Sequence, residues 1–406
     1  MSPLNLVIPA GVAPEVKWLF MARALRALCD GYVAILLPAY LLALGLGTFE
    51  VGVISTATLL GSATPTLTVG AWGYRFHHRV LLLAAATLMM LTGFGLAGLS
   101  SFWPLLMVAF AGTINPSSGD VSVFLPLEHA RIAEAAQDNE RTKVFARYSL
   151  IGALFAAVGA LAAGLPDVLV GQGMDYLMAL RMMFVLYGCT GIIIWWLYQR
   201  IPEPPPHEQP APPQPLGASR KTVFKLAALF SLDAFAGGFI MNTLLSLWLF
   251  QKFNLSLASA GHFFFWAGLF TAFSQLAAPW LARRIGLLNT MVFTHIPASV
   301  LLIIAAFTPS LFWVMFLLLV RALLSQMDVP TRSAFVMAVV TPPERAAAAS
   351  FTSVPRSLAS AISPSIGGAL FAAGYLAMPL VLCGVLKIIY DLAIWKEFRA
   401  HEKAGK

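Results

Sequence analysis

The sequence predicts an all-α membrane protein with twelve transmembrane helices in two pseudo-symmetric six-helix bundles. Of the 406 residues 59% are hydrophobic and only 11% are charged, whereas about a quarter of the residues in soluble domains are charged. A helix needs about 20 apolar residues to cross a bilayer, so twelve spans and their loops fit the length of this chain. A proline-rich stretch divides the apolar runs into two sets of six.

The apolar runs are long enough to be assigned one by one to membrane spans. The first six spans are expected near residues 17–44, 50–72, 79–98, 102–127, 144–166 and 176–198. The second six are expected near residues 222–250, 257–282, 288–307, 311–339, 346–373 and 376–396. Between the two sets, the prolines from Pro202 to Pro215 rule out a regular helix. The predicted domains are therefore an N-terminal bundle (1–199), a cytoplasmic linker (200–221) and a C-terminal bundle (222–406).

The loops predict the orientation, because lysine and arginine near span ends stay in the cytoplasm. With the amino terminus inside, the cytoplasmic connections hold most of the basic loop residues, whereas the opposite loops hold Lys252 and little else. We therefore expect a multi-pass protein of a bacterial inner membrane with both termini in the cytoplasm. The formal net charge of +8 is then explained by the basic residues of the cytoplasmic loops, and no nucleic-acid partner is expected.

Several other classes of protein are excluded by what the chain lacks. Cys29, Cys189 and Cys383 lie in apolar runs without the spacing of a disulfide framework or a metal site. No positive charge precedes Lys17, so a cleaved signal peptide is not expected. No catalytic or phosphate-binding motif occurs, so neither an enzyme nor a bound cofactor is expected.

The two halves also resemble each other in sequence. Four features recur in the same order: Asp30-Gly31-Tyr32 with Asp233-Ala234-Phe235, the stretch from Phe102-Trp103 to Asp120 with that from Phe312-Trp313 to Asp328, Glu140-Arg141 with Glu344-Arg345, and Arg147 with Arg356. Two parallel copies of a six-helix unit are an architecture of secondary transporters, whose substrate sites lie near the middle of the membrane.

These features resemble the major facilitator superfamily of secondary transporters over essentially the whole chain. The resemblance includes the end of span one, from Leu37 to Gly47, and the segment from Pro343 to Gly368. The family's signature loop between spans two and three has a counterpart at 70–79, but Tyr74 and His77 replace its acidic residue and its second glycine. The glycine-proline motif typical of exporters in span five is also incomplete. The resemblance implies transport by alternating access.

Charged side chains inside spans are expensive unless they are paired or face water, so they are the candidate site residues. A buried aspartate beside an arginine can take up and release a proton as the pair opens and closes. We assign proton coupling to Asp30 and Asp120 with Arg26 and Arg147, and the substrate cavity to Asp233, Asp328, Arg332 and Arg356. The alternative is that the i, i+4 pairs Arg26–Asp30 and Asp328–Arg332 are static salt bridges.

A second set of charges is expected at the cytoplasmic ends of the spans. This predicted gate consists of Arg75, Glu128, Glu140, Arg141, Glu344 and Arg345. The alternative is that the two Glu-Arg dipeptides are solvated helix caps. His262 and His295 each stand alone in a span, which favours core histidines over metal or proton sites.

Taken together, the sequence predicts a secondary active transporter of a small organic molecule, working as a monomer in a lipid bilayer. The leading prediction is a proton-coupled exporter that acts as an antiporter. The alternative is a proton-coupled importer of a small organic anion, with sodium as a possible replacement for the proton. A membrane sensor or scaffold without transport is a remote third reading.

Overall fold

The computed structural model describes most of the chain as helix. The described residues are 15–72, 78–115, 124–135, 138–202, 217, 219–341 and 344–404. Within these ranges the side chains of 65–72, 130, 133–135, 138–143, 345–347, 350 and 400–404 lie outside the description. The described residues form sixteen α-helices and no strand. The all-helical fold class is therefore confirmed.

The chain separates into two compact units, which are described one at a time. Unit 1 contains residues 1–209 together with 255–265, and unit 2 contains residues 210–254 and 266–406. The division between Gln209 and Pro210 lies in the stretch that the sequence predicts as a linker, 200–221. The short piece 255–265, which begins α12 (Leu257–Ile285), was expected in the C-terminal bundle and groups with unit 1 instead.

The described residues of unit 1 form eight complete helices and the start of α12. The complete helices are α2 (Val16–Ala43), α3 (Thr48–Trp72), α4 (His78–Gly98), α5 (Phe102–Ala111), α6 (Phe124–Ala135), α7 (Asp138–Ala162), α8 (Leu165–Gly171) and α9 (Tyr176–Gln199). The helix α2 packs against α7 and α9, and α4 packs against α9. The close approach of α2 and α7 requires glycine, because a Cβ on Gly31 would lie 2.1 Å from the carbonyl oxygen of Ala156.

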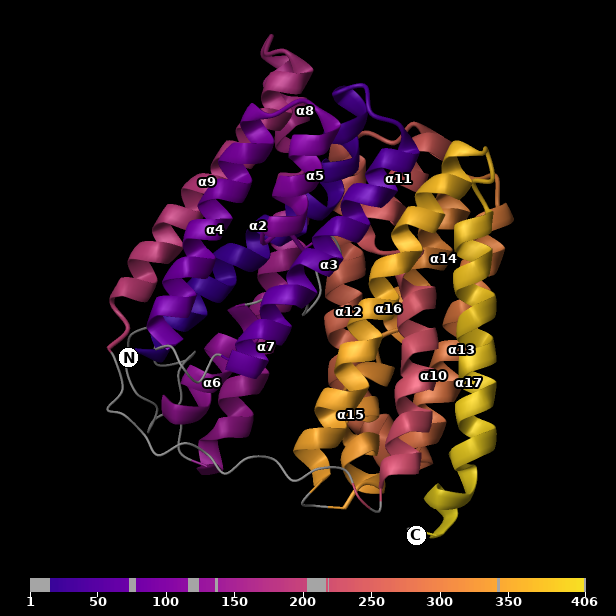
Figure 1. Ribbon diagram of the computed structural model, residues 1–406. Coiled ribbons are helices and arrows are strands. Elements are labelled where there is room, and N and C mark those ends of the chain that lie inside the picture. Colours follow the sequence, from indigo (N-terminus) through magenta and orange to yellow (C-terminus); the bar gives the residue numbers. More distant parts are fainter. Residues whose placement is uncertain are drawn as a thin grey trace, which may run out of the picture. The chain divides into compact units, whose positions relative to one another are not determined.

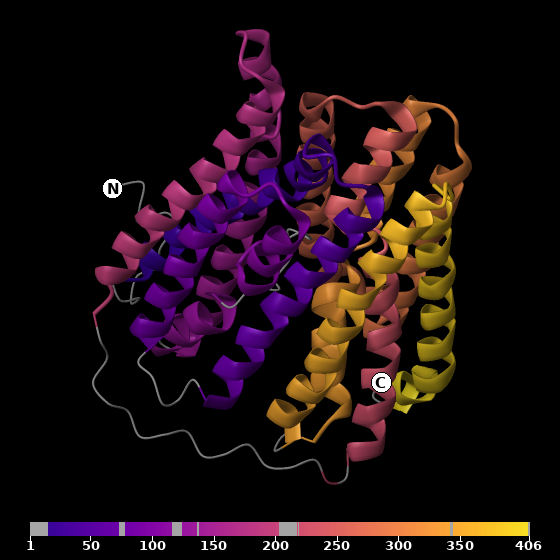
Figure 2. The ribbon, with the colours of Figure 1, turned by 45° about the horizontal axis from the view of Figure 1, so that its top comes forward.

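Unit 2 contains the remaining helices and most of α12. They are α10 (Arg220–Gly238), α11 (Asn242–Phe253), α13 (Leu287–Phe307), α14 (Leu311–Leu324), α15 (Asp328–Val339), α16 (Arg345–Ala372) and α17 (Met378–Ala404). The helix α10 packs against α16 and α17, and α13 packs against α17. Figures 1 and 2 show α10, α16 and α17 side by side.

The packing of the helices repeats between the two units. In the order of the internal repeat, α2, α4, α7 and α9 correspond to α10, α13, α16 and α17. The pairs α2–α7, α4–α9 and α2–α9 are in contact in unit 1, and the pairs α10–α16, α13–α17 and α10–α17 are in contact in unit 2. The sequence repeat therefore corresponds to a repeat of the fold.

Spans four, seven and ten, which the sequence predicts as continuous helices, are each interrupted. In span four α5 ends at Ala111 and residues 112–115 are not helical. The break in span seven separates α10 from α11 at Phe239–Met241, and that in span ten separates α14 from α15 at Ser325–Met327. At the break in span seven α10 lies so close to α16 that a Cβ on Gly238 would be 2.1 Å from Oγ of Ser363. The break in span seven begins six residues after Asp233, and the break in span ten lies directly before Asp328.

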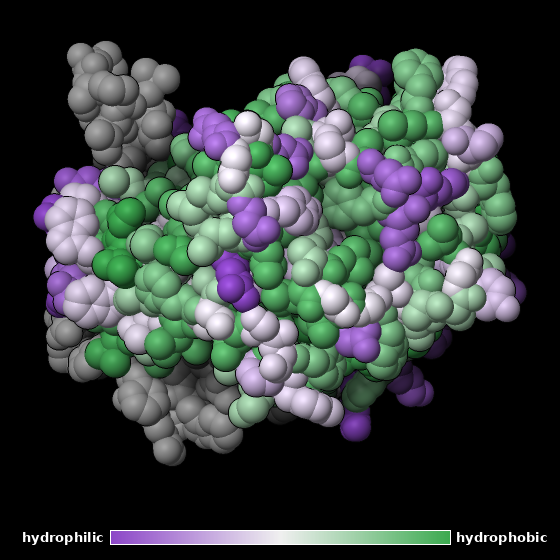
Figure 3. Space-filling model, turned by 90° about the horizontal axis from the view of Figure 1, so that it is seen from above, coloured by the Kyte–Doolittle hydropathy of each residue, from purple (hydrophilic) through white to green (hydrophobic). Residues whose placement is uncertain are grey.

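The helices carry large apolar side chains on their outer surfaces, as expected for contact with lipid. Nine segments among the described residues are long and apolar enough to cross a membrane. The other three predicted spans fall on α3, on α5 with α6, and on α16, so the helices are consistent with twelve spans. On the face seen in Figure 3, hydrophilic side chains lie among the hydrophobic ones.

Candidate functional site

A buried carboxylate in unit 1 is surrounded by groups from three other helices. Glu128 of α6 is fully buried and forms an ion pair with Arg26 of α2. Tyr148 of α7 donates its hydroxyl hydrogen to the same carboxylate oxygen, and Tyr198 of α9 donates to the other oxygen at 2.6 Å. The guanidinium of Arg26 lies 4.1 Å from the ring centroid of Phe124. We call Arg26, Glu128, Tyr148 and Tyr198 the N-terminal centre.

The residues predicted to couple protons in unit 1 lie around this centre or outside the description. Asp30 follows Arg26 by one turn of α2 and is half-buried, and Arg26 and Arg23 are the cations that act on it electrostatically. The ion pair that Arg26 makes is with Glu128, 102 residues away. One guanidinium nitrogen of Arg147, Nη1, is buried without a hydrogen-bond partner among the described residues. Asp120 lies outside the described residues.

A larger cluster of charges lies inside unit 2. Arg332 of α15 donates to Asp233 of α10 and to Asp328 of α15, each at 3.0 Å. Lys387 of α17 donates to the second oxygen of Asp233 at 2.6 Å. The carboxylate of Asp233 is therefore held by two cations from two helices.

The cluster continues from Lys387 to a histidine on α13. Nε2 of His295 lies 3.2 Å from Nζ of Lys387 and 3.9 Å from Oδ1 of Asp233. Nδ1 of the same ring lies 3.0 Å from Oδ1 of Asp391 on α17. Five of the six side chains in this cluster are buried, and the side chain of Lys387 is 11% exposed. We call this set the C-terminal centre: Asp233, His295, Asp328, Arg332, Lys387 and Asp391.

The structure brings together three of the four residues assigned to the substrate cavity, namely Asp233, Asp328 and Arg332. The fourth, Arg356 of α16, is half-buried and acts electrostatically on Asp233 and Arg332. Its Nε is buried without a hydrogen-bond partner among the described residues. Whether this cluster lines a substrate cavity stays a prediction.

Sequence reasoning overlooked two members of the C-terminal centre, Lys387 and Asp391. Both lie inside the predicted span 376–396, with the i, i+4 spacing that was used to select other pairs. A complete inventory of charges inside spans would have found them. The contribution of His295 could not be found in this way, because its partners come from other helices.

The residues of the predicted gate lie in different environments. Glu344 accepts hydrogen bonds from the backbone N–H of Gly217, from that of Ser219 at 3.1 Å and from the hydroxyl of Thr341 at 2.6 Å. Hydrogen bonds from the side chains of Ser219 and Thr341 and from these backbone groups lower the pKa of Glu344 to about 2. This carboxylate therefore ties the start of α10 to the start of α16 within unit 2.

The other gate residues are less informative. Glu128 belongs to the N-terminal centre. Arg75 lies outside the described residues, and so do the side chains of Glu140, Arg141 and Arg345, although their backbones are helical. A joint role in a gate stays a prediction for all six.

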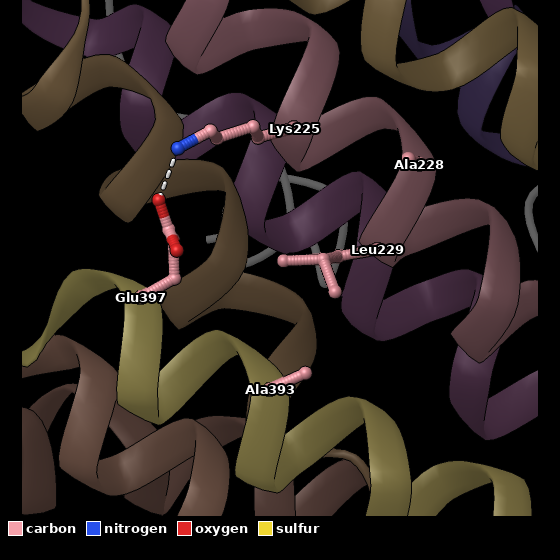
Figure 4. A pocket seen from close by; sticks show the side chains of 5 residues that line it. All are labelled: Lys225, Ala228, Leu229, Ala393 and Glu397. Atoms are coloured by element: carbon pink, nitrogen blue, oxygen red, sulfur yellow. Dashed lines mark hydrogen bonds and ion pairs between the residues drawn. The ribbon is translucent and has the colours of Figure 1, made fainter.

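A small pocket of about 300 Å³ lies between α10 and α17. It is lined by Lys225, Ala228, Leu229, Ala393 and Glu397, and Lys225 forms an ion pair with Glu397 across it (Figure 4). Both charged side chains are about half exposed. Asp233 lies two turns further along α10, so the pocket and the C-terminal centre occupy different levels of the same helix pair. The residues described by the structure contain no group of three side chains suited to bind a metal.

The comparisons with known proteins agree with this fold. A family model described as Major Facilitator Superfamily matches residues 19–320 and 226–405. An uncharacterized membrane protein of Saccharomyces cerevisiae, YJR124C, is 25% identical over 430 residues, which covers 97% of this chain and 96% of the yeast protein.

Two solved transporters have a similar fold at low sequence identity. One is a bacterial homolog of the human lysosomal transporter Spinster, in an inward-facing and occupied conformation (TM-score 0.75, 16% identity, 95% of this chain and 96% of that chain). The other is the nucleoside transporter NupG (TM-score 0.71, 16% identity, 95% and 99%). The chain belongs to the Major Facilitator Superfamily. It is a multi-pass membrane transporter and not an enzyme.

Proposed function

We propose that the protein is a proton-coupled secondary transporter that moves a small organic anion by alternating access. The observation that carries the proposal is the C-terminal centre, in which Asp233 lies between the two cations Arg332 and Lys387. Ionisable groups at membrane depth are expensive and are typically part of a substrate or proton pathway. A carboxylate whose cations can exchange partners links the binding of a charged solute to the movement of a proton.

The arginines beside the two centres support a negatively charged substrate. Arg147 in unit 1 and Arg356 in unit 2 each have a buried guanidinium nitrogen without a hydrogen-bond partner among the described residues. A guanidinium binds a carboxylate or a phosphate with parallel hydrogen bonds, and it stays charged at all physiological pH values. A cationic drug would meet repulsion at both places.

The charge of the substrate bears on the direction of transport. An anion and a proton neutralise each other, so a shared site favours their movement in the same direction. With an inward proton gradient that movement is uptake, which was the alternative in the sequence analysis. The leading prediction from the sequence was export by antiport. A cationic substrate would favour antiport, because it competes with the proton for the same site.

In unit 1 we propose Asp30 and Asp120 as further protonatable groups. Asp30 is half-buried and lies within the electrostatic reach of Arg23 and Arg26. Because Arg26 is engaged by Glu128, its influence on Asp30 depends on the state of the N-terminal centre. We propose that the chain acts as a monomer in a bacterial inner membrane with both termini in the cytoplasm, as the basic loops indicate.

Flux measurements in proteoliposomes test the proposed function. Radiolabelled organic anions, organic cations and neutral solutes are offered under an imposed pH gradient, and separately under a sodium gradient. We expect an anion to accumulate inside when the outside is acidic, and no effect of sodium. Accumulation that does not depend on the pH gradient would contradict proton coupling. Exchange of organic cations, but not of anions, against protons would establish antiport.

Variants separate the roles of the acidic residues in the same assay. Asp233→Asn is expected to abolish pH-driven accumulation, and Asp30→Asn and Asp120→Asn are expected to reduce it. Lys225→Met removes an exposed charge from the same helix as Asp233 and serves as the matched control. If all three Asn variants transport like the wild type, the proton pathway lies elsewhere. If no solute moves under any gradient while a ligand binds, the sensor alternative is supported.

A further inference from the structure

His295 lies in the middle of the C-terminal centre, and its two ring nitrogens face different partners. Nζ of Lys387 lies 3.2 Å from Nε2, and an ammonium group can only donate hydrogen bonds. Nε2 is therefore the acceptor and carries no proton. The ring proton is then on Nδ1, from which it is donated to Asp391 at 3.0 Å. In this state His295 is a neutral imidazole.

The charges around this imidazole come from every helix that packs against α13 or Asp233. The charged and titratable groups are Lys387, Tyr390 and Asp391 of α17, Asp233 of α10, Asp328 and Arg332 of α15, and Arg356 of α16. Arg321 of α14 acts on Cys383 of α17. Arg332, Lys387 and Arg356 are the three cations that act most strongly on Asp233, whereas Arg321 is not among them. With the imidazole neutral, these three cations equal Asp233, Asp328 and Asp391 in number, so one added proton gives this set an excess of one positive charge.

A proton on Nε2 changes which group pairs with Asp233. The imidazolium would have a carboxylate at each nitrogen, Asp391 at Nδ1 and Asp233 at 3.9 Å from Nε2. It could thus replace Lys387 as the cation beside Asp233, since Lys387 can no longer donate to a protonated Nε2. The step breaks the hydrogen bond from Nζ to Nε2 and forms one from Nε2 to Oδ1, and no covalent bond other than N–H changes.

We propose that His295 takes up the coupling proton and that Lys387, released by this exchange, binds the anionic group of the substrate. Lys387 is suited to this task because its ammonium sits on a long flexible stem and binds an anion as a point charge. Its side chain is 11% exposed, against 5% for Asp233 and 3% for His295. Lys387 is therefore the most exposed member of the trio.

The exchange also defines the class of substrate, and in this respect it rests on the proposed function. One proton adds one positive charge, and a low-dielectric interior favours neutralising that charge. The matching substrate carries a single negative charge, such as a monocarboxylate or a sulfonate. Proton and anion then move together without net charge.

A glycine of α10 lies beside the ammonium group of Lys387. Gly237 lies at the end of α10, where an added Cβ would be 3.9 Å from Nζ of Lys387. Any larger side chain would occupy space beside the ammonium. The helix ends at Gly238, so Lys387 lies beside the interruption of span seven and not beside a continuous helix.

The pH dependence of thermal stability tests the exchange without any substrate. Lys387→Met removes one cation from Asp233, and at about pH 8.5 it should lower the Tm. At about pH 5.5 a protonated His295 should replace the missing cation, so the Tm deficit relative to the wild type should fall by at least half. In the double variant Lys387→Met/His295→Gln the deficit should be the same at both pH values.

A matched control variant and a second measurement test whether His295 is the group that takes the proton. His262→Gln changes an exposed histidine and should leave the recovery in Lys387→Met intact. Recovery that persists in the double variant would show that Asp233 itself takes the proton, which overturns the proposal. In the wild type, ¹⁵N NMR of labelled histidine, assigned with His295→Gln, should show an unprotonated Nε2 near pH 7.5, and a protonated Nε2 there would overturn it as well.

Transport of defined probes tests the substrate class. Labelled lactate, benzoate and glucuronate serve as monoanions, and succinate serves as a dianion. Uptake of a monoanion should be driven by the pH gradient, should be unaffected by a potassium diffusion potential, and should lose its pH dependence in His295→Gln. A monoanion carried with unchanged pH dependence by His295→Gln would refute the role of His295 while the proposed function stands.

Discussion

In the N-terminal centre a single carboxylate, Glu128, is enclosed by one arginine and two tyrosines, whereas in the C-terminal centre Asp233 shares its two cations with other groups. Arg26 and both phenols point to Glu128, and phenols keep their protons at physiological pH. Arg332 also pairs with Asp328, and Lys387 also contacts His295. In the first arrangement all three partners converge on one carboxylate and join four helices; the second can exchange partners.

The comparison shows that two copies of one fold can use buried charge for different purposes. Both centres connect a pair of helices that correspond in the repeat, α2 with α9 in unit 1 and α10 with α17 in unit 2. Stability is expected to depend more on the N-terminal centre, and transport more on the C-terminal centre. Variants of Glu128 and Asp233 test this difference, and variants of Glu344 and Lys225 provide comparisons outside the two centres.

The largest effect on stability is expected from Glu128→Ala. The variant leaves Arg26 buried without its ion-pair partner, and removal of one partner of a buried pair typically costs about 3–5 kcal/mol. The measurement is the unfolding free energy in detergent, by titration with denaturant. A loss below about 1 kcal/mol would mean that the N-terminal centre behaves like a surface ion pair.

A smaller loss of stability is expected from Asp233→Asn. Arg332 keeps Asp328 and Lys387 keeps His295, so the loss should be about 1.5–3 kcal/mol, the range for hydrogen bonds to charged groups. The same unfolding titration measures it, next to the transport assay in which this variant should lose its response to pH. A stability loss equal to that of Glu128→Ala would remove the distinction between the two centres.

Glu344→Gln should change stability in a pH-dependent way. The pKa of Glu344 is lowered from the ordinary 4.5 to about 2 in the folded protein, so its contribution is fully present above pH 4.5 and is lost as the pH falls towards 2. The Tm difference between the wild type and Glu344→Gln should be constant between about pH 5 and pH 8 and should shrink in more acidic buffer. A difference that grows on acidification would contradict the assigned hydrogen bonds.

The smallest effect is expected from Lys225→Met. The ion pair between Lys225 and Glu397 is about half exposed on both sides, and such pairs contribute about 0–1 kcal/mol. Unfolding titrations at low and high salt should therefore coincide for the variant and the wild type. A clear loss at low salt would show that the pocket between α10 and α17 has a larger structural role.

Much of the fold could be predicted from the sequence because a span is a local property. Span nine was expected at 288–307 and α13 covers Leu287–Phe307, since about 20 consecutive apolar residues suffice to define it. The interruptions of spans seven and ten were not predicted, because they depend on contacts such as that of Gly238 with Ser363. The apolar composition of a span does not indicate where a neighbouring helix approaches it.

The site was predictable only in part, for a related reason. The i, i+4 rule brought Asp328 and Arg332 together, and they do form an ion pair at 3.0 Å. The same rule paired Arg26 with Asp30, whereas the ion pair of Arg26 is made with Glu128 on another helix. Helical spacing determines which side chains can meet along one helix, and it says nothing about competition from a second one.

Hydropathy and the order of motifs are properties of the chain itself, so they were sufficient to predict the family, the number of spans and the presence of charges at membrane depth. How those charges combine depends on the packing of the helices. This packing encloses Glu128 with two tyrosines and places His295 between Asp391 and Lys387. Buried charges choose partners by distance in a low-dielectric interior, and those distances are set by the packing of helices that lie far apart in sequence.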